Sequence, residues 1–189
     1  MSRYFLFALL IGLSLFAGCK PDEPEVTEPP SDPAFSATPY NLVIPSFFPP
    51  MDIPANNPLT VEGVELGRYL FWEKNLSADG SQSCGSCHLP EHGFSDPNRF
   101  SAGITGALGT RQSMALVNLG WAYNYFWDGR AHTLEEQVIE PITNPIEMNN
   151  TWENALNSLR QNPLYPSMFE AAYGTPDITQ DRAAKAMAS

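Results

Sequence analysis

Two cysteines and a histidine form the segment of this sequence with the clearest capacity for chemistry. Cys84-Gly85-Ser86-Cys87-His88 places two thiols three positions apart, with an imidazole directly after the second. On one helical turn, both thiols can reach the vinyl groups of a haem while the histidine ligates its iron. A redox dithiol requires a preceding strand and a β-α-β context, and a zinc site requires a second pair of ligands. The sequence shows neither, so it predicts one covalent c-type haem on Cys84, Cys87 and His88.

The sixth coordination position of that haem separates enzymes from electron carriers. A carrier normally fills both axial positions, whereas an enzyme keeps one open or weakly held. His92 follows His88 by four residues and is too near to reach the opposite haem face, and His132 is expected to be an exposed residue ahead of a helix. A methionine, Met114 or Met148, would instead make the chain a mono-haem electron-transfer cytochrome, and this alternative stays open.

The first residues have the layout of an export signal. Arg3 precedes an apolar stretch from Tyr4 to Phe16, which is followed by Ala17-Gly18 and then Cys19. The stretch is short for a membrane-spanning helix, and a cysteine directly after small residues is typical of a bacterial lipobox. We therefore expect residues 1–18 to be a lipoprotein signal peptide and Cys19 to be lipidated; a plain cleaved signal is the alternative.

The residues that follow Cys19 have too little apolar content to fold. Residues 19–39 are rich in proline and acidic side chains, which predicts a flexible, solvated tether between membrane and domain. The whole chain carries 21 acidic and 10 basic residues, a net charge of −11. This charge argues against nucleic acid as a partner and favours a small protein that presents a basic patch.

Helix signals dominate residues 40–189, and no alternating pattern predicts a strand. Thr60 can cap a helix that runs to Trp72, and Thr133 with Glu136 forms a capping box for a helix that runs to Glu140. Further helices are expected after Thr151, before Gly174 and after Thr179. The stretch from Pro90 to Thr110 is expected to be a long loop. The fold class predicted is all-α.

Several separate sequence blocks together resemble the N-terminal haem domain of bacterial di-haem cytochrome c peroxidases and their MauG-type relatives. The resemblance covers roughly residues 40–189, and its blocks are Leu66–Phe71, Leu76-Ser77, Cys84–Asp96, Phe126–Ala131, Leu134–Gln137, Pro141-Ile142, Asn144-Pro145 and Glu147-Met148. It implies a cytochrome c-like haem domain with long loops, holding the haem that reacts with peroxide.

The resemblance also implies roles for individual residues. His88 corresponds to the proximal ligand, and Glu147 to the distal glutamate that moves a proton between the two peroxide oxygens. Gln137 corresponds to a distal amide that hydrogen-bonds peroxide or water, and Pro141 to a residue that packs over the distal face. Trp127 corresponds to an indole between the two haems of the family.

Three departures from the family qualify this expectation. The loop from Gly93 to Phe126 contains no histidine, whereas reductively activated members carry a distal one there, so we expect a resting haem that is open to water or peroxide. No second Cys-x-x-Cys-His motif for the family's other haem domain follows in this sequence, and we expect the chain to be truncated; a one-haem product that needs an external electron donor is the alternative. Gln112 stands where the family has a calcium-binding asparagine, so calcium is not expected.

The resulting functional hypothesis is haem-dependent reduction of hydrogen peroxide with electrons from a small cytochrome c or cupredoxin. The chain would be held in the bacterial cell envelope, periplasmic or at the surface, by the lipid on Cys19 alone. The alternatives are the mono-haem electron carrier and a MauG-like oxidation of a protein side chain.

Overall fold

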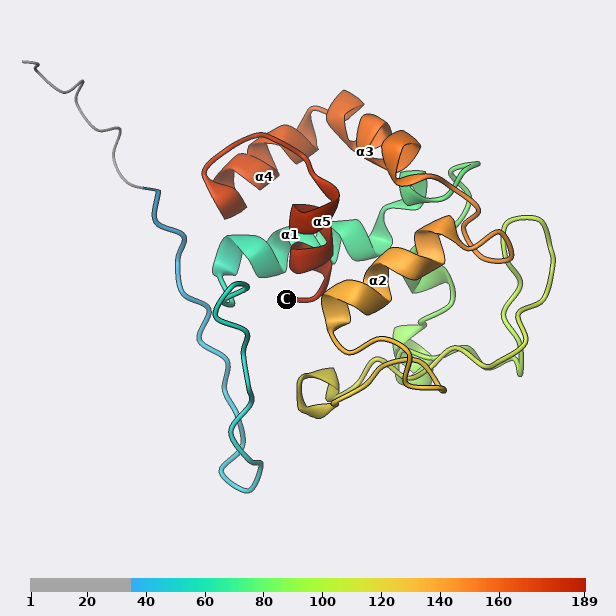
Figure 1. The fold of residues 1–189 in the computed structure, drawn as a ribbon, viewed down its shortest axis with the longest axis horizontal. Coiled ribbons are helices and arrows are strands. Elements are labelled where there is room, and N and C mark those ends of the chain that lie inside the picture. The colour runs from blue at the N-terminus through green and yellow to red at the C-terminus, as the bar shows by residue number, and fades with distance from the viewer. Residues whose placement is uncertain (1–34) are drawn as a thin grey trace, which may run out of the picture. The chain divides into compact units, whose positions relative to one another are not determined.

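The computed structural model describes residues 35–189. The predicted signal peptide, Cys19 and the tether up to residue 34 lie outside the described residues. In the described part, five α-helices and several one-turn 3-10 helices are joined by long loops, and β-structure is limited to isolated bridges (Figure 1). The all-α prediction is confirmed.

Helix α1 (Val61–Trp72) and helix α5 (Gln180–Met187) cross at the centre of the fold (Figure 1). Thr60 caps α1 as predicted, because its hydroxyl accepts a hydrogen bond from the Gly63 amide at 3.0 Å. A Cβ atom at Gly67 would overlap the carbonyl oxygen of Ala186, so the helices can approach this closely only because residue 67 is glycine.

Helices α3 (Trp152–Gln161) and α4 (Leu164–Tyr173) complete the core above this crossing (Figure 1). Both follow the predicted pattern: Thr151 caps α3, and Gly174 ends α4 with a φ of 72°. Tyr165 of α4 is buried, and its hydroxyl donates a 2.6 Å hydrogen bond to Glu73 at the end of α1. The core therefore joins segments that are far apart in the sequence.

Helix α2 (Leu134–Thr143) differs from its prediction in two details. The Thr133 hydroxyl accepts from the Glu136 amide as expected, but the Glu136 carboxylate accepts from the amide of His132 instead of Thr133. The helix also continues past Glu140 and contains Pro141. Proline has no N–H, so one intrahelical hydrogen bond is missing at that position.

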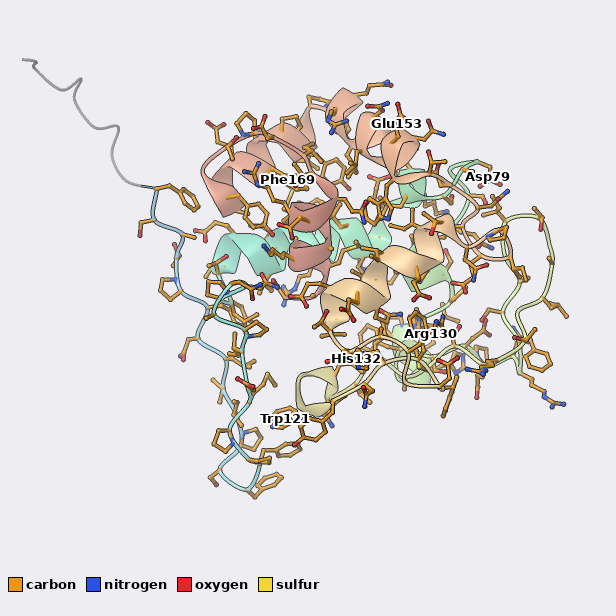
Figure 2. The ribbon with its side chains drawn as sticks, in the orientation of Figure 1. Asp79, Trp121, Arg130, His132, Glu153 and Phe169 are labelled. Atoms are coloured by element: carbon orange, nitrogen blue, oxygen red, sulfur yellow. The ribbon has the colours of Figure 1, made fainter. Side chains whose placement is uncertain are left out.

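Long loops connect the haem motif to α2, as the sequence predicts. Between residues 93 and 133 only one short 3-10 helix, η4 (Leu119–Trp121), interrupts the irregular chain. The Trp121 indole donates to the Pro49 carbonyl at 2.9 Å, which ties this loop to the extended segment before α1 (Figure 2). The same extended segment contacts the start of α1, where the Thr38 carbonyl accepts a hydrogen bond from the Val61 amide at 2.8 Å. None of the helices in residues 35–189 is long and apolar enough to span a bilayer.

Candidate functional site

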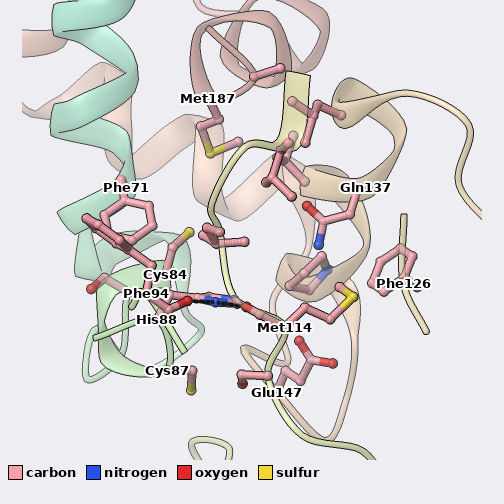
Figure 3. Close-up of a pocket in the computed structure, with 18 of the residues that line it drawn as sticks. Phe71, Cys84, Cys87, His88, Phe94, Met114, Phe126, Gln137, Glu147 and Met187 are labelled. Carbon is pink, nitrogen blue, oxygen red and sulfur yellow. Dashed lines mark hydrogen bonds between the residues drawn. The ribbon is translucent and has the colours of Figure 1, made fainter. Parts of the chain in front are cut away.

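The residues predicted to do chemistry line one large cavity. Its volume is about 1080 Å³, at the top of the roughly 300–1,000 Å³ range of small-molecule sites. Cys84, Cys87 and His88 lie on one side, and Gln137 and Glu147 lie on the other (Figure 3). Much of the remaining lining is apolar, including Phe71, Phe94, Met114, Phe126, Pro141 and Met187.

The orientation of His88 is fixed by two backbone carbonyls. Its Nδ1–H donates to the carbonyl oxygens of Phe94 and Met114, each at 3.0 Å (Figure 3). Both partners are acceptors, so Nδ1 carries the proton and Nε2 keeps its lone pair. Burial lowers the pKa of His88, which keeps the ring neutral. This is the tautomer that binds a metal through Nε2.

The two thiols are free and weakly acidic. Cys84 and Cys87 form no disulfide. Burial raises the pKa of Cys84 to about 11, and burial is also the main cause of the raised pKa of Cys87. A redox dithiol needs a thiol pKa that is lowered, and a zinc site needs further ligands. No group of three potential metal-binding side chains occurs in residues 35–189, so both alternatives lack support.

Local packing holds the motif against α1. The 3-10 helix η2 (Cys84–Ser86) is preceded by its N-cap residue Ser83, whose amide donates to the Ser86 hydroxyl at 3.0 Å. Gly85 is buried against the ring of Trp72, and a Cβ atom at Gly85 would overlap that ring. A side chain at residue 85 therefore fits only if the Trp72 ring moves.

Free thiols, an available imidazole nitrogen and a mainly apolar cavity suit a c-type haem. The thiols can form thioethers with the vinyl groups, the Nε2 atom can bind the iron, and the apolar lining can cover the porphyrin faces. The residues present thus fit the cofactor that their spacing predicts.

Glu147 lies in a tight turn after α2, on the cavity side. Its Oε1 accepts a 2.8 Å hydrogen bond from the Asn144 amide group, and its carbonyl accepts from the Ile104 amide at 3.0 Å. Gly103 packs against this turn so closely that a Cβ atom there would overlap the Ile146 carbonyl. Glu147 is an exposed residue, but desolvation of its carboxyl by the surrounding chain raises its pKa, although the Arg130 charge and the Asn144 hydrogen bond act in the opposite direction. The carboxyl therefore stays protonated to a higher pH than an ordinary glutamate.

The other predicted site residues also reach the cavity. Gln137 and Pro141 are partly buried on α2, and the helix presents both to the cavity. Trp127 lies at its edge with 64% of its surface exposed, and its indole donates to the Gln112 carbonyl at 2.8 Å. The structure brings Glu147, Gln137, Pro141 and Trp127 together with His88, although they come from separate segments.

Arg130 is a further cavity residue whose role the sequence did not indicate. Its guanidinium lies 3.4 Å from the centre of the Phe126 ring and pairs with Asp128 and Glu140 at 3.0 and 2.8 Å. The positive charge acts on the Glu147 carboxylate. The only sequence signal for a role of Arg130 was its place in the block Phe126–Ala131. Its pairing with Glu140 depends on the fold and could not be read from the sequence.

Of the other residues considered as ligands of the haem iron, the two methionines line the cavity and the two histidines do not. His92 and His132 are exposed and do not line the cavity, and Nδ1 of His132 is hydrogen-bonded to Asn124 at 2.8 Å. Met114 and Met148 both line it, so a methionine ligand is compatible with the geometry. Gln112 donates to the Asp96 carbonyl at 3.1 Å.

Comparisons with known proteins identify the family of this chain. A family model described as di-haem cytochrome c peroxidase matches residues 61–189. Among curated proteins, the methylamine utilization protein MauG of Methylophilus methylotrophus is 37% identical over 72% of this chain and 41% of its own length. The cytochrome c551 peroxidase of Nitrosomonas europaea is 36% identical over 74% of this chain and 42% of its own length.

A solved structure gives the same result. The crystal structure of a MauG-like protein associated with microbial copper homeostasis has a TM-score of 0.74 and 33% identity, covering 79% of this chain and 45% of that one. The chain thus spans about two fifths of the length of the curated relatives, 41% and 42% for the two above. It belongs to the di-haem cytochrome c peroxidase family.

Proposed function

We propose that this chain binds one c-type haem through Cys84, Cys87 and His88 and takes part in the reduction of hydrogen peroxide to water. The observation that carries the proposal is that a carboxyl with a raised pKa, Glu147, shares one cavity with the available Nε2 side of His88. Perturbed acids beside a cofactor site are frequent in catalysis. The family's haem chemistry supports the same conclusion.

When bound, the haem supplies the iron at which peroxide binds and its O–O bond breaks. Glu147 would accept the proton of the oxygen nearer the iron and deliver it to the leaving oxygen, so one carboxyl acts as both base and acid. Asn144 holds Oε1, and no donor in the described part of the chain is bonded to Oε2, which leaves that atom for the proton. Gln137 would hydrogen-bond the bound peroxide or water, and Pro141 would limit the space above the haem.

Electrons would come from a small redox protein, a cytochrome c or a cupredoxin. The net charge of −11 favours a donor with a basic surface. Trp127 offers an aromatic group that is both exposed and on the cavity edge, and it would lie on the route of the electron. The chain would work in the bacterial cell envelope, with Cys19 lipidated as its membrane anchor.

A second candidate is a mono-haem electron carrier. It is favoured by Met114 and Met148, which line the same cavity and offer a sulfur ligand for the sixth position. The two candidates predict different resting haems: an open site reacts with peroxide, whereas a sulfur-ligated haem does not.

The test uses the chain expressed with c-type haem maturation, together with the variants Glu147→Gln and Glu153→Gln. Glutamine keeps an oxygen acceptor for Asn144 but cannot carry the proton, and exposed Glu153 on α3 is a matched control away from the cavity (Figure 2). We expect the peroxide-induced change of the haem spectrum to slow by about 10²–10⁴-fold in Glu147→Gln and to be unchanged in the control. A ferric haem with a low-spin spectrum that peroxide does not alter would instead identify an electron carrier.

A further inference from the structure

Asp96 is a buried carboxylate on the His88 side of the site, outside the proposed catalytic set. Only 7% of its surface is exposed, and it is the one charged residue among the buried side chains of residues 35–189. It takes part in none of the ion pairs found in that part of the chain. Burial of an unpaired charge is costly unless hydrogen bonds compensate for it.

Hydrogen bonds hold this carboxylate in its ionised form. Oδ1 accepts from the backbone amide and the side-chain amide of Asn98 at 2.8 and 2.9 Å, and Oδ2 accepts from the Ser101 hydroxyl at 2.7 Å. Burial opposes ionisation, but these donors outweigh it and bring the pKa of Asp96 below its usual value. Exposed His92 adds a weaker effect in the same direction.

The charge lies close to the residues that would hold the haem. The Asp96 charge acts on both the Cys87 thiol and the His88 ring: it adds to the rise that burial causes in the pKa of Cys87, and it partly opposes the fall that burial causes in the pKa of His88. Ser101, which donates to Asp96, is also hydrogen-bonded to the Ser113 hydroxyl at 2.8 Å and lines the cavity. The carboxylate is thus separated from the cavity wall by a single serine.

We propose that Asp96 is a positioning residue whose fixed negative charge lowers the reduction potential of the haem. The proposal rests on the proposed function, because it requires haem at Cys84, Cys87 and His88. A buried anion stabilises ferric over ferrous haem, since the ferric form carries one more positive charge. It therefore favours the oxidised states of the iron that a reaction with peroxide requires.

The test compares the reduction potential of the haem-loaded chain with that of three variants. Asp96→Asn removes the charge, while its amide keeps an oxygen for Asn98 and the Ser101 hydroxyl can turn to accept. Ser101→Ala removes the hydrogen bonds of the Ser101 hydroxyl to Asp96 and to Ser113 and keeps the charge. Asp79→Asn is the matched control: Asp79 also accepts from a following amide and a serine hydroxyl, at 2.9 and 2.7 Å from Ser81, but it lies on an exposed loop that does not line the cavity (Figure 2).

We expect Asp96→Asn to have the more positive potential. At a fixed applied potential, its ferrous-to-ferric ratio should rise roughly tenfold, the size of effect of one charge acting through protein at an effective dielectric constant of about 20. Ser101→Ala and Asp79→Asn should stay near the wild type. An unchanged potential in Asp96→Asn, or an equal shift in Ser101→Ala, would overturn the proposal.

The haem content of each protein distinguishes a failure of the Asp96 proposal from a failure of the proposed function. A pyridine haemochrome assay reports covalent attachment independently of the potential. If the wild-type chain attaches no haem, the proposed function itself fails. If all four proteins attach haem but the reduction potential of Asp96→Asn does not rise as expected, only the proposal about Asp96 fails.

Discussion

Replacing Gly85 by alanine tests how closely the haem motif packs against α1. The glycine is buried, and its φ lies outside the left-handed region, so alanine meets no backbone strain there. The added methyl group would overlap the Trp72 ring, whose atoms lie too close to the place that the new Cβ would occupy. The substitution therefore isolates one steric contact inside the segment Cys84–His88.

The magnitude follows from two opposing effects. Overpacking a filled site costs about 1–3 kcal/mol, whereas glycine to alanine at a permitted conformation gains about 0.4–1 kcal/mol through the unfolded chain. Trp72 is 52% exposed, so its ring can move partly into solvent and the cost should lie in the lower half of the range. We expect a net loss of about 1 kcal/mol, or roughly 2–4 °C in the unfolding midpoint.

The assay is urea unfolding of the haem-loaded chain, followed by far-UV circular dichroism, for the wild type, Gly85→Ala, Trp72→Ala and the double variant. If the ring is the obstacle, Gly85→Ala should become neutral or slightly stabilising once Trp72 is alanine. An equal loss in both backgrounds would show that the cost has another origin and would refute the reasoning.

Three further predictions concern Glu147 and the core. Asn144→Ala should reduce the rate of the peroxide reaction less than Glu147→Gln does, because it frees the carboxyl without removing it; stopped-flow rates would check this. In the wild type the rate of the peroxide reaction should fall as the pH decreases through the raised pKa of Glu147, because the protonated carboxyl cannot act as a base. This fall should occur at a higher pH than the pKa of roughly 4.3 of an ordinary glutamate, and it should be absent in Glu147→Gln. Tyr165→Phe removes the 2.6 Å bond to Glu73 and should cost about 1–2 kcal/mol of unfolding free energy. A double-mutant cycle with Glu73→Ala, which removes the acceptor, would show no coupling if that bond is unimportant.

Local features of the sequence determined the helices and the predicted haem-attachment motif. Thr60, Thr151 and Thr179 each cap the helix that was predicted to follow them, because a cap bonds an amide only three residues away. The spacing of Cys84, Cys87 and His88 is similarly a property of one turn. Where two local partners compete, as at Glu136, the sequence could not choose between the amides of His132 and Thr133.

The roles of more distant residues required a family resemblance or the structure. The resemblance pointed to Glu147, but its environment depends on the loop contact at Gly103 and on the Asn144 hydrogen bond. Nothing in the sequence indicated Arg130 as a neighbour of the carboxyl, because its position depends on the packing of the preceding loop against α2.

The sequence by itself determined an all-α chain with a c-type haem motif, since caps, helical periodicity and the Cys84–His88 spacing act over a few residues. Only the tertiary structure decided the tautomer of His88, through the carbonyl of Met114, and the burial of Asp96 beside it. These properties depend on which distant segments exclude water from a side chain and supply its hydrogen bonds. That outcome is set by the packing of the whole fold, and no short stretch of sequence contains it.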